Sequence, residues 1–363
     1  MQKKIIVLAI AAALTAPAAF AADASNVTVY GKADMAFGST SNGTVTNQQV
    51  SSQVTKFGIK GSEDLGDGLA AIWQIEQQVD IDNAGGTNST KNTLASRNSF
   101  LGLKGESWGT VLLGRHDTPY KIATRGLDNF GDQFNDNRNL MGGVGKSVGG
   151  TMDARPANVV AYMSPKMGGF SAAVAYAVNT ETAVAANAKG SIWSLAGMYD
   201  QDGINGSIAY QTIKYTTAVG GQFIGAAGDS ISSWKIGGGY KFDALNLGAV
   251  YEKTSSSIGG VNTLGRNNYT LNGTYTFGNN DVKLAYTVAG NTNGVGATGA
   301  SEVAVGYDHN FSKRTSLYVQ YAQISNNAGA AYTFGTAAST AAVGGVANGG
   351  KPSGFLVGMK HSF

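Results

Sequence analysis

The stretch Gly354–Phe363 (GFLVGMKHSF) alternates in a way that decides the fold. Every second residue falls on one face of an extended chain, and this face carries Phe355, Val357, Met359, His361 and Phe363. A soluble chain that ended on such a strand would leave an apolar edge open to aggregation. The ending suits a strand that closes a sheet on itself and turns its apolar face to lipid. The stretch therefore predicts an outer-membrane β-barrel.

The N-terminal segment predicts the same location. Two lysines precede an apolar run over residues 5–14, and the A-x-A site Ala19-Phe20-Ala21 follows. The run is well short of the roughly 20 residues that a transmembrane helix needs. We therefore expect a cleavable signal peptide over residues 1–21, a barrel over residues 22–363, and export to the outer membrane of a Gram-negative bacterium.

Composition excludes several classes of protein. With 52 Gly, 16 Tyr, 14 Phe and 5 Pro, the chain favours strands and tight turns, so we expect an all-β fold. Without the two signal-peptide lysines, 24 basic residues face 23 acidic ones, a balance that predicts no nucleic-acid partner. There is no cysteine, and His116, His309 and His361 lie far apart in the sequence. We expect no metal, no cofactor and no catalytic residues.

The connections between alternating segments give a strand count. Seven connections are short: 61–68, 105–109, 164–169, 200–203, 242–245, 277–281 and 310–314. Eight stretches rich in Gly, Ser, Thr, Asn and Ala are long: 39–52, 83–95, 117–156, 179–190, 216–231, 254–266, 291–300 and 326–352. Fifteen connections predict a transmembrane antiparallel barrel of 16 strands, with both termini on the periplasmic side. A barrel of this size encloses a water-filled channel, which favours transport.

Several segments together resemble a known family. They are Val27–Phe37, Lys56–Gly68, Ser96–Gly105, Leu113–Tyr120, Arg155–Phe170 and the terminal KHSF. In order and spacing they resemble the trimeric general porins of Gram-negative bacteria, most of all the Neisseria and Burkholderia branch. The resemblance implies a homotrimer that passes ions and small hydrophilic solutes by passive diffusion. It also implies that the third extracellular loop folds inward and that lipid and lipopolysaccharide surround the barrel. It further implies that the barrel assembly machinery recognises the terminal Phe363.

A selective pore needs opposite charges on opposite walls. The third long loop, Asp117 to about Asp153, carries the candidate acidic wall: Asp128, Asp132 and Asp136. The resemblance supplies the candidate basic wall: Lys32, Lys56, Arg115 and Arg155.

Strand alternation supports some of these basic candidates as inward-facing residues and does not support others. It places Lys32 and Lys56 on the polar face, but it places Arg115 on the apolar face unless the chain bulges after Gly114. Arg155 begins a strand, where alternation decides little. The family branch often has arginine where Lys56 stands and a second basic residue near Arg97, so the sign of the ion preference stays open. The alternative is that these cations pair at the rim and that the loop acids are simply solvated.

Two other functions remain to be weighed against passive diffusion. A substrate-specific channel would need an aromatic slide or a ligand pocket, and alternation places no clear inward aromatic row. An outer-membrane enzyme would gather catalytic side chains at one rim, and no such arrangement is recognisable. An adhesin or receptor role of the long loops is compatible with transport and stays open.

Overall fold

The strands of the barrel wall account for most of the residues that the structure describes. The computed structural model describes residues 26–82, 94–144, 151–181, 189–217, 222, 226, 228–258, 261–335 and 345–363. The predicted signal peptide, residues 1–21, lies outside the described residues. No α-helix in the described ranges is long and apolar enough to cross a membrane.

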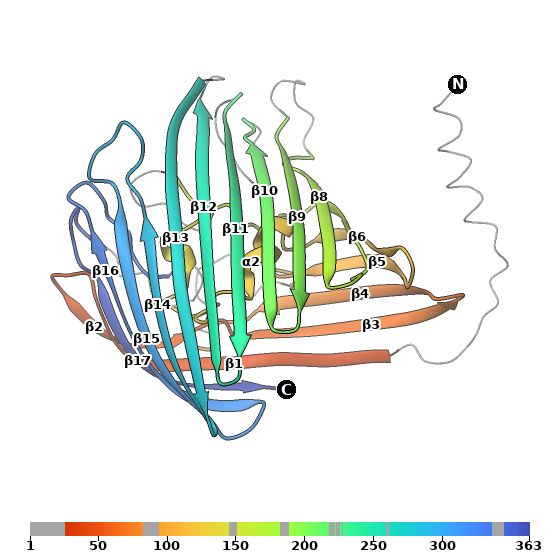
Figure 1. The fold of residues 1–363 in the computed structure, drawn as a ribbon, viewed down its shortest axis with the longest axis horizontal. Coiled ribbons are helices and arrows are strands. Elements are labelled where there is room, and N and C mark those ends of the chain that lie inside the picture. Colours follow the sequence, from red (N-terminus) through yellow and green to blue (C-terminus); the bar gives the residue numbers. More distant parts are fainter. Residues whose placement is uncertain are drawn as a thin grey trace.

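The described residues form one continuous antiparallel sheet (Figure 1). Its strands are β1 (Asn26–Ser41), β2 (Thr46–Ser52), β3 (Lys56–Gly66), β4 (Leu69–Gln78), β5 (Ser99–Gly105), β6 (Gly109–Arg115), β7 (Val159–Met163), β8 (Phe170–Val178), β9 (Ser191–Gln201), β10 (Ile204–Lys214), β11 (Ser230–Phe242), β12 (Leu245–Ile258), β13 (Val261–Phe277), β14 (Asn280–Ala289), β15 (Ala300–Asn310), β16 (Thr315–Asn326) and β17 (Ser353–Ser362). Two short helices, α2 (Pro119–Arg125) and η1 (Asn137–Asn139), lie in the connection between β6 and β7.

Strands β2 and β3 form a single strand of the wall with an interruption. The first part of β1 pairs with β3 and the second part pairs with β2. Across the break, the Gln53 N–H donates to the Asp34 carbonyl (2.9 Å), and the Asp34 N–H donates to Thr55 Oγ1 (3.0 Å). Counted this way, the wall has the predicted 16 strands.

The barrel closes between its first and last strands, as predicted. β17 pairs antiparallel with β1 from Lys32↔Ser362 to Ser41↔Ser353, and the two strands run side by side in Figure 1. Beyond this register, Gly31 and Phe363 exchange two backbone hydrogen bonds of 3.0 and 3.1 Å. The closed ladder satisfies the backbone polar groups that an open edge would leave unpaired.

All seven predicted short connections join consecutive strands, but two of the predicted long loops are wrong. In the range 39–52, β1 continues to Ser41 and β2 begins at Thr46. In the range 254–266, β12 continues to Ile258 and β13 begins at Val261. Both ranges are rich in Ser, Thr and Asn. Backbone ladders do not depend on apolar side chains, so these hairpins extend past the apolar band that revealed the other strands.

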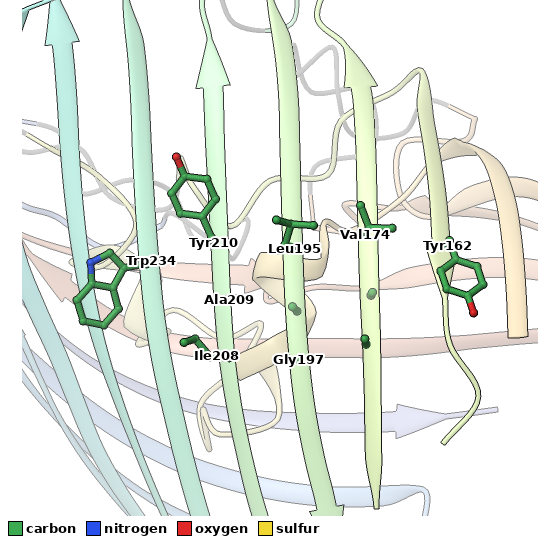
Figure 2. A pocket seen from close by; sticks show the side chains of 11 residues that line it. Tyr162, Val174, Leu195, Gly197, Ile208, Ala209, Tyr210 and Trp234 are labelled. Atoms are coloured by element: carbon green, nitrogen blue, oxygen red, sulfur yellow. The ribbon is translucent and has the colours of Figure 1, made fainter. Parts of the chain in front are cut away.

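The outer face of the wall is apolar and exposed. In β14, Val282, Leu284 and Tyr286 are 43%, 56% and 41% exposed, whereas Lys283 between them is 8% exposed. This is the reverse of a soluble protein, where exposed strand faces are polar. Figure 2 shows a shallow groove of about 460 Å³ on this face, lined by side chains that include Tyr162, Leu195, Tyr210 and Trp234.

The hydrophobic core lies between the β6–β7 connection and the inner face of the wall. Tyr120, Phe130 and Phe134 of this connection are fully buried. They pack in two clusters on small wall residues such as Ala209 and Ala304. Alanines on the inner face leave room for these rings, so the connection is held against the wall by packing as well as by polar contacts.

Candidate functional site

The connection between β6 and β7, residues 116–158, is the long loop of the sequence analysis. Its helix α2 begins with the N-cap Thr118, whose side chain accepts from the Lys121 N–H, and has proline in its first turn. The second helix, η1, is capped by Asp136, which accepts from the Arg138 N–H (2.9 Å). These two caps give definite shape to a segment with no regular periodicity.

Side chains of β11 and β12 contact the long loop near both its first and its last residues. The Tyr120 hydroxyl contacts Glu252 Oε2 (2.6 Å) and Ser233 Oγ (2.7 Å), both on inward-facing positions of β11 and β12. Burial and the nearby Glu252 charge raise the pKa of Tyr120, which therefore stays protonated and donates to the carboxylate. Lys235 of β11 forms an ion pair of 2.7 Å with Asp153 near the end of the loop.

Contacts on a distant part of the wall hold the middle of the loop. Gln320 of β16 donates to the side-chain carbonyl of Gln133 (2.6 Å), and the Phe134 N–H donates to Gln53 Oε1 (2.9 Å). The long loop thus contacts β11 and β12 near its first and last residues. Its middle contacts β16 and the break between β2 and β3.

The three predicted loop acids form one ion-pair cluster with two arginines. Arg125 lies 3.3 Å from Asp128, 3.3 Å from Asp132 and 2.5 Å from Asp136. Arg138 lies 2.9 Å from Asp132 and 2.8 Å from Asp136. The side chains of Asp128 and Asp136 are 3% and 0% exposed, whereas that of Asp132 is 29% exposed. Only Asp132 of the three acids keeps substantial access to water.

The electrostatic environment separates the acids further. Burial raises the pKa of Asp128 to about 6. The charge of Asp136 also raises this pKa, whereas the charge of Arg125 lowers it. Burial alone would also raise the pKa of Asp132, but Arg125 and Arg138 together hold it well below its usual range. The same two arginines lower the pKa of Asp136 in spite of its burial. Asp132 also has a positive φ of 65°, a conformation uncommon for a residue other than glycine.

Opposite Asp132 lie the basic residues of β1, β3 and the segment before β5. Arg97 Nη2 is 3.9 Å from Asp132 Oδ2, and Arg97 Nε is 2.6 Å from Glu76 Oε1. Lys56 also pairs with Glu76 (3.3 Å), and Lys32 pairs with Asp34 of its own strand (3.1 Å). Because the charge of Lys32 contributes to lowering the pKa of Asp132, the lysine and the loop acid lie within electrostatic reach of each other.

The exposure of this basic group is uneven. The side chains of Lys56 and Lys32 are 29% and 17% exposed, whereas those of Glu76 and Asp34 are 6% and 0% exposed. The lysines therefore present charge to water, and the carboxylates that hold them are covered.

Arg115 and Arg155 belong to a second group, around Asp117. Arg155 Nε lies 2.8 Å from Asp117 Oδ1, and Arg115 Nη1 donates to the Arg155 carbonyl (3.2 Å). Lys121 pairs with the same carboxylate (2.9 Å), and burial lowers the pKa of this lysine to about 8. Alternation disfavoured an inward Arg115 unless the chain bulged after Gly114. Gly114 has a φ of 141°, but β5 and β6 pair without a register shift from Ser99↔Arg115 to Gly105↔Gly109, so the described register contains no bulge there.

The structure therefore divides the predicted residues among three places. Lys32 lies within electrostatic reach of Asp132, and Lys56 is its cross-strand neighbour. Asp128 and Asp136 lie inside the loop, and Arg115 and Arg155 lie at the root of the loop. Four further residues take part in these groups without having been predicted: Arg125, Arg138, Glu76 and Asp117. In the sequence, Glu76 alternates with the apolar Ile75 and falls on the same strand face as Gln74 and Gln78, which was a usable signal. No sequence signal indicated the ion pairs inside the loop, because residues of an irregular segment meet without any fixed spacing.

Comparisons with known proteins agree with this architecture. The family model described as "Gram-negative porin" matches residues 8–329. Outer membrane porin protein 32 of Delftia acidovorans is 30% identical over 381 residues that cover 100% of both chains. Major outer membrane protein P.IB of Neisseria lactamica is 28% identical over 384 residues, again with 100% of both chains covered. Among solved structures, the anion-selective porin from Comamonas acidovorans superposes with a TM-score of 0.78 at 25% identity, covering 94% of this chain and 100% of that one.

Proposed function

Because the chain belongs to the Gram-negative porin family, we propose that its channel is narrowed by the long loop and crossed there by a transverse electric field. The protein is a general outer-membrane porin for passive diffusion and has no enzymatic activity. The proposal assigns the acidic side of the constriction to Asp132 and the basic side to Lys32, Lys56 and Arg97. The observation that carries it is the partly exposed Asp132 carboxylate, 3.9 Å from Arg97, together with the two partly exposed lysines of β1 and β3.

We further propose a modest preference for anions. A permeating ion responds most to charges that are exposed to water, because buried pairs are neutralised locally. On the wall the lysines are exposed and their carboxylate partners are covered. At the root of the loop, Lys121 and Arg155 share the single carboxylate of Asp117 and Arg115 lies beside them, which leaves a net positive charge there. The Comamonas acidovorans porin, described as anion-selective, supports the same sign.

Reversal of charge at Lys56 tests the basic side. At about 10 Å from a unit charge in water an ion feels about 0.4 kcal/mol. Since Lys56→Glu changes the charge by two units, we expect the anion-to-cation permeability ratio to fall by about fourfold after salt screening. The measurement is the reversal potential of the refolded protein in planar bilayers under a salt gradient.

The matched control is Lys313→Glu, which makes the same charge change in the exposed short turn between β15 and β16. We expect it to leave the reversal potential close to that of the parent. Equal reversal potentials for both variants would remove Lys56 from the constriction. Asp132→Asn should move the ratio in the opposite direction to Lys56→Glu, toward anions.

We also propose that three copies of the chain assemble into a homotrimer. OmpT of Vibrio cholerae, described in a trimer form, has the same fold with a TM-score of 0.69 at 17% identity and coverage of 94% of this chain. The proposal predicts that channels enter a bilayer in steps of three equal conductances and that chemical cross-linking stops at a trimer. Insertion in single steps together with a monomeric cross-linking pattern would contradict it.

Two further partners belong to the proposal. The exposed apolar outer face suits contact with lipid and lipopolysaccharide. Phe363, which is 51% exposed beside the barrel seam, is accessible to the barrel assembly machinery.

A further inference from the structure

We infer that glycines on the inner wall act as positioning residues that set the distance between the wall and the long loop, and so the width left for solutes. This inference rests on the proposal that the long loop narrows the channel. It assigns a role to Gly237, Gly239, Gly306 and Gly354, each of which lies directly under an apolar side chain of the loop.

The first contact lies under Leu127, just after α2. A Cβ added at Gly237 would stand 2.6 Å from Leu127 Cδ1 and 2.9 Å from Thr124 Cγ2. A Cβ added at Gly239 would stand 2.5 Å from Asn205 Oδ1 of β10 and 2.7 Å from Leu127 Cδ2. Leu127 therefore sits in a hollow that the two glycines of β11 leave open.

Two more contacts lie under aromatic rings on the other side of the barrel. A Cβ at Gly306 of β15 would stand 2.7 Å from Phe130 Cε1, and a Cβ at Gly354 of β17 would stand 2.7 Å from Phe134 Cε2. Both rings are fully buried, and Phe134 also packs at 5.3 Å on Phe334. The rings therefore have little free space into which they could retreat.

Backbone conformation does not explain these glycines. None of the four has a φ in the left-handed region, so other residues could adopt the same backbone. Gly238 lies between Gly237 and Gly239 and faces outward, and a Cβ there would meet nothing within 4 Å. What distinguishes the inward glycines is the loop side chain seated on each of them.

The geometry gives a direction to the effect. Carbon atoms in contact stand about 3.5–4.0 Å apart, so an added methyl group at 2.7 Å must be relieved by a shift of about 1 Å. The wall is tied by its ladder on both sides, whereas the loop is held by side-chain contacts. The loop is the part that moves, and it moves away from the wall into the channel.

The experiment compares Gly306→Ala and Gly354→Ala with Gly238→Ala in planar bilayers. We expect a loss of single-channel conductance in the two inward variants and the parental conductance in the Gly238 variant. Combining Gly306→Ala with Phe130→Leu, which removes ring atoms above the added methyl group, should restore the conductance. The double variant also provides the test if Gly306→Ala alone yields no folded barrels.

Parental or raised conductance in both inward variants would overturn the inference, as would a double variant that shows no recovery from a conductance loss. The Lys56→Glu measurement separates this failure from failure of the charged constriction. If Lys56→Glu shifts the reversal potential while the glycine variants match Gly238→Ala, the constriction stands and the glycine inference is wrong.

Discussion

Three acidic residues in one short segment have different surroundings: Asp128, Asp132 and Asp136. The spacing of four residues places no two of them in equivalent surroundings once the loop has folded. Asp136 accepts from Arg125, Arg138 and the capped turn of η1, and it is fully buried. Asp132 meets the same arginines but stays exposed toward Arg97. Asp136 is therefore a structural residue of the loop, and Asp132 is the one for which we propose a role in the passage of ions.

The raised pKa of Asp128 predicts that the ion preference of the channel depends on pH. Its pKa is raised to about 6, so it gains a proton as the pH falls from 7 to 5, while Asp132 and Asp136, with lowered pKa values, stay ionised. Protonation removes one negative charge from the loop, so anion preference should rise by about twofold with a midpoint near pH 6. Reversal potentials measured from pH 5 to 7.5 give the midpoint.

Asp128→Asn should abolish this transition and show the stronger anion preference at every pH. His116 also lies in the long loop, and burial lowers its pKa from the ordinary value. His116→Gln is therefore the control and should leave the transition in place. A transition that survives in Asp128→Asn and disappears in His116→Gln would reassign it to the histidine.

At the scale of elements, the seam between β1 and β17 depends on the last residue described. Phe363 exchanges two backbone hydrogen bonds with Gly31, and its ring covers that glycine. Deleting Phe363 removes both bonds, each worth about 0.5–1.5 kcal/mol, and uncovers the edge of β1. We expect a clear loss in the yield of folded barrels and unchanged conductance in the barrels that form.

The yield is measured as the folded fraction on unheated gels, and the conductance in planar bilayers. Phe311→Ala is a suitable control, because Phe311 is another exposed aromatic residue, 60% exposed, at a short turn. A deletion variant that folds as well as this control but conducts differently would contradict the seam argument.

The strands could be predicted where apolar and polar residues alternate, because one face of the wall is apolar and the other is polar. The short turns could be predicted because positions such as Asp67 and Asp202, each followed by glycine, have positive φ, which this residue pair tolerates. The hairpins that join β1 to β2 and β12 to β13 could not, since their flanking strands carry polar residues on both faces. The long loop could be recognised by its length, but not its internal ion pairs, which depend on tertiary contacts alone.

At the scale of the whole molecule, the wall and the long loop are stabilised by different interactions. The wall is one closed antiparallel ladder, in which each strand is bonded to two neighbours. The loop is held by packing of Tyr120, Phe130 and Phe134 and by individual polar contacts such as Lys235–Asp153. Since segments held by individual contacts open more readily than a closed backbone ladder, we expect rising urea to abolish ion discrimination before it reduces the β-strand signal in circular dichroism. Simultaneous loss of both would show that loop and wall form one cooperative unit.

The seating of an apolar loop inside a polar wall has a consequence for the cell envelope. Damage to an ordinary globular protein exposes its core and removes its activity. Under the proposal that the long loop narrows the channel, the core of this protein fills part of the passage. Partial damage would therefore open the passage instead of blocking it. A weakened copy would act as a leak, admitting larger solutes through an otherwise intact membrane, long before the barrel itself came apart.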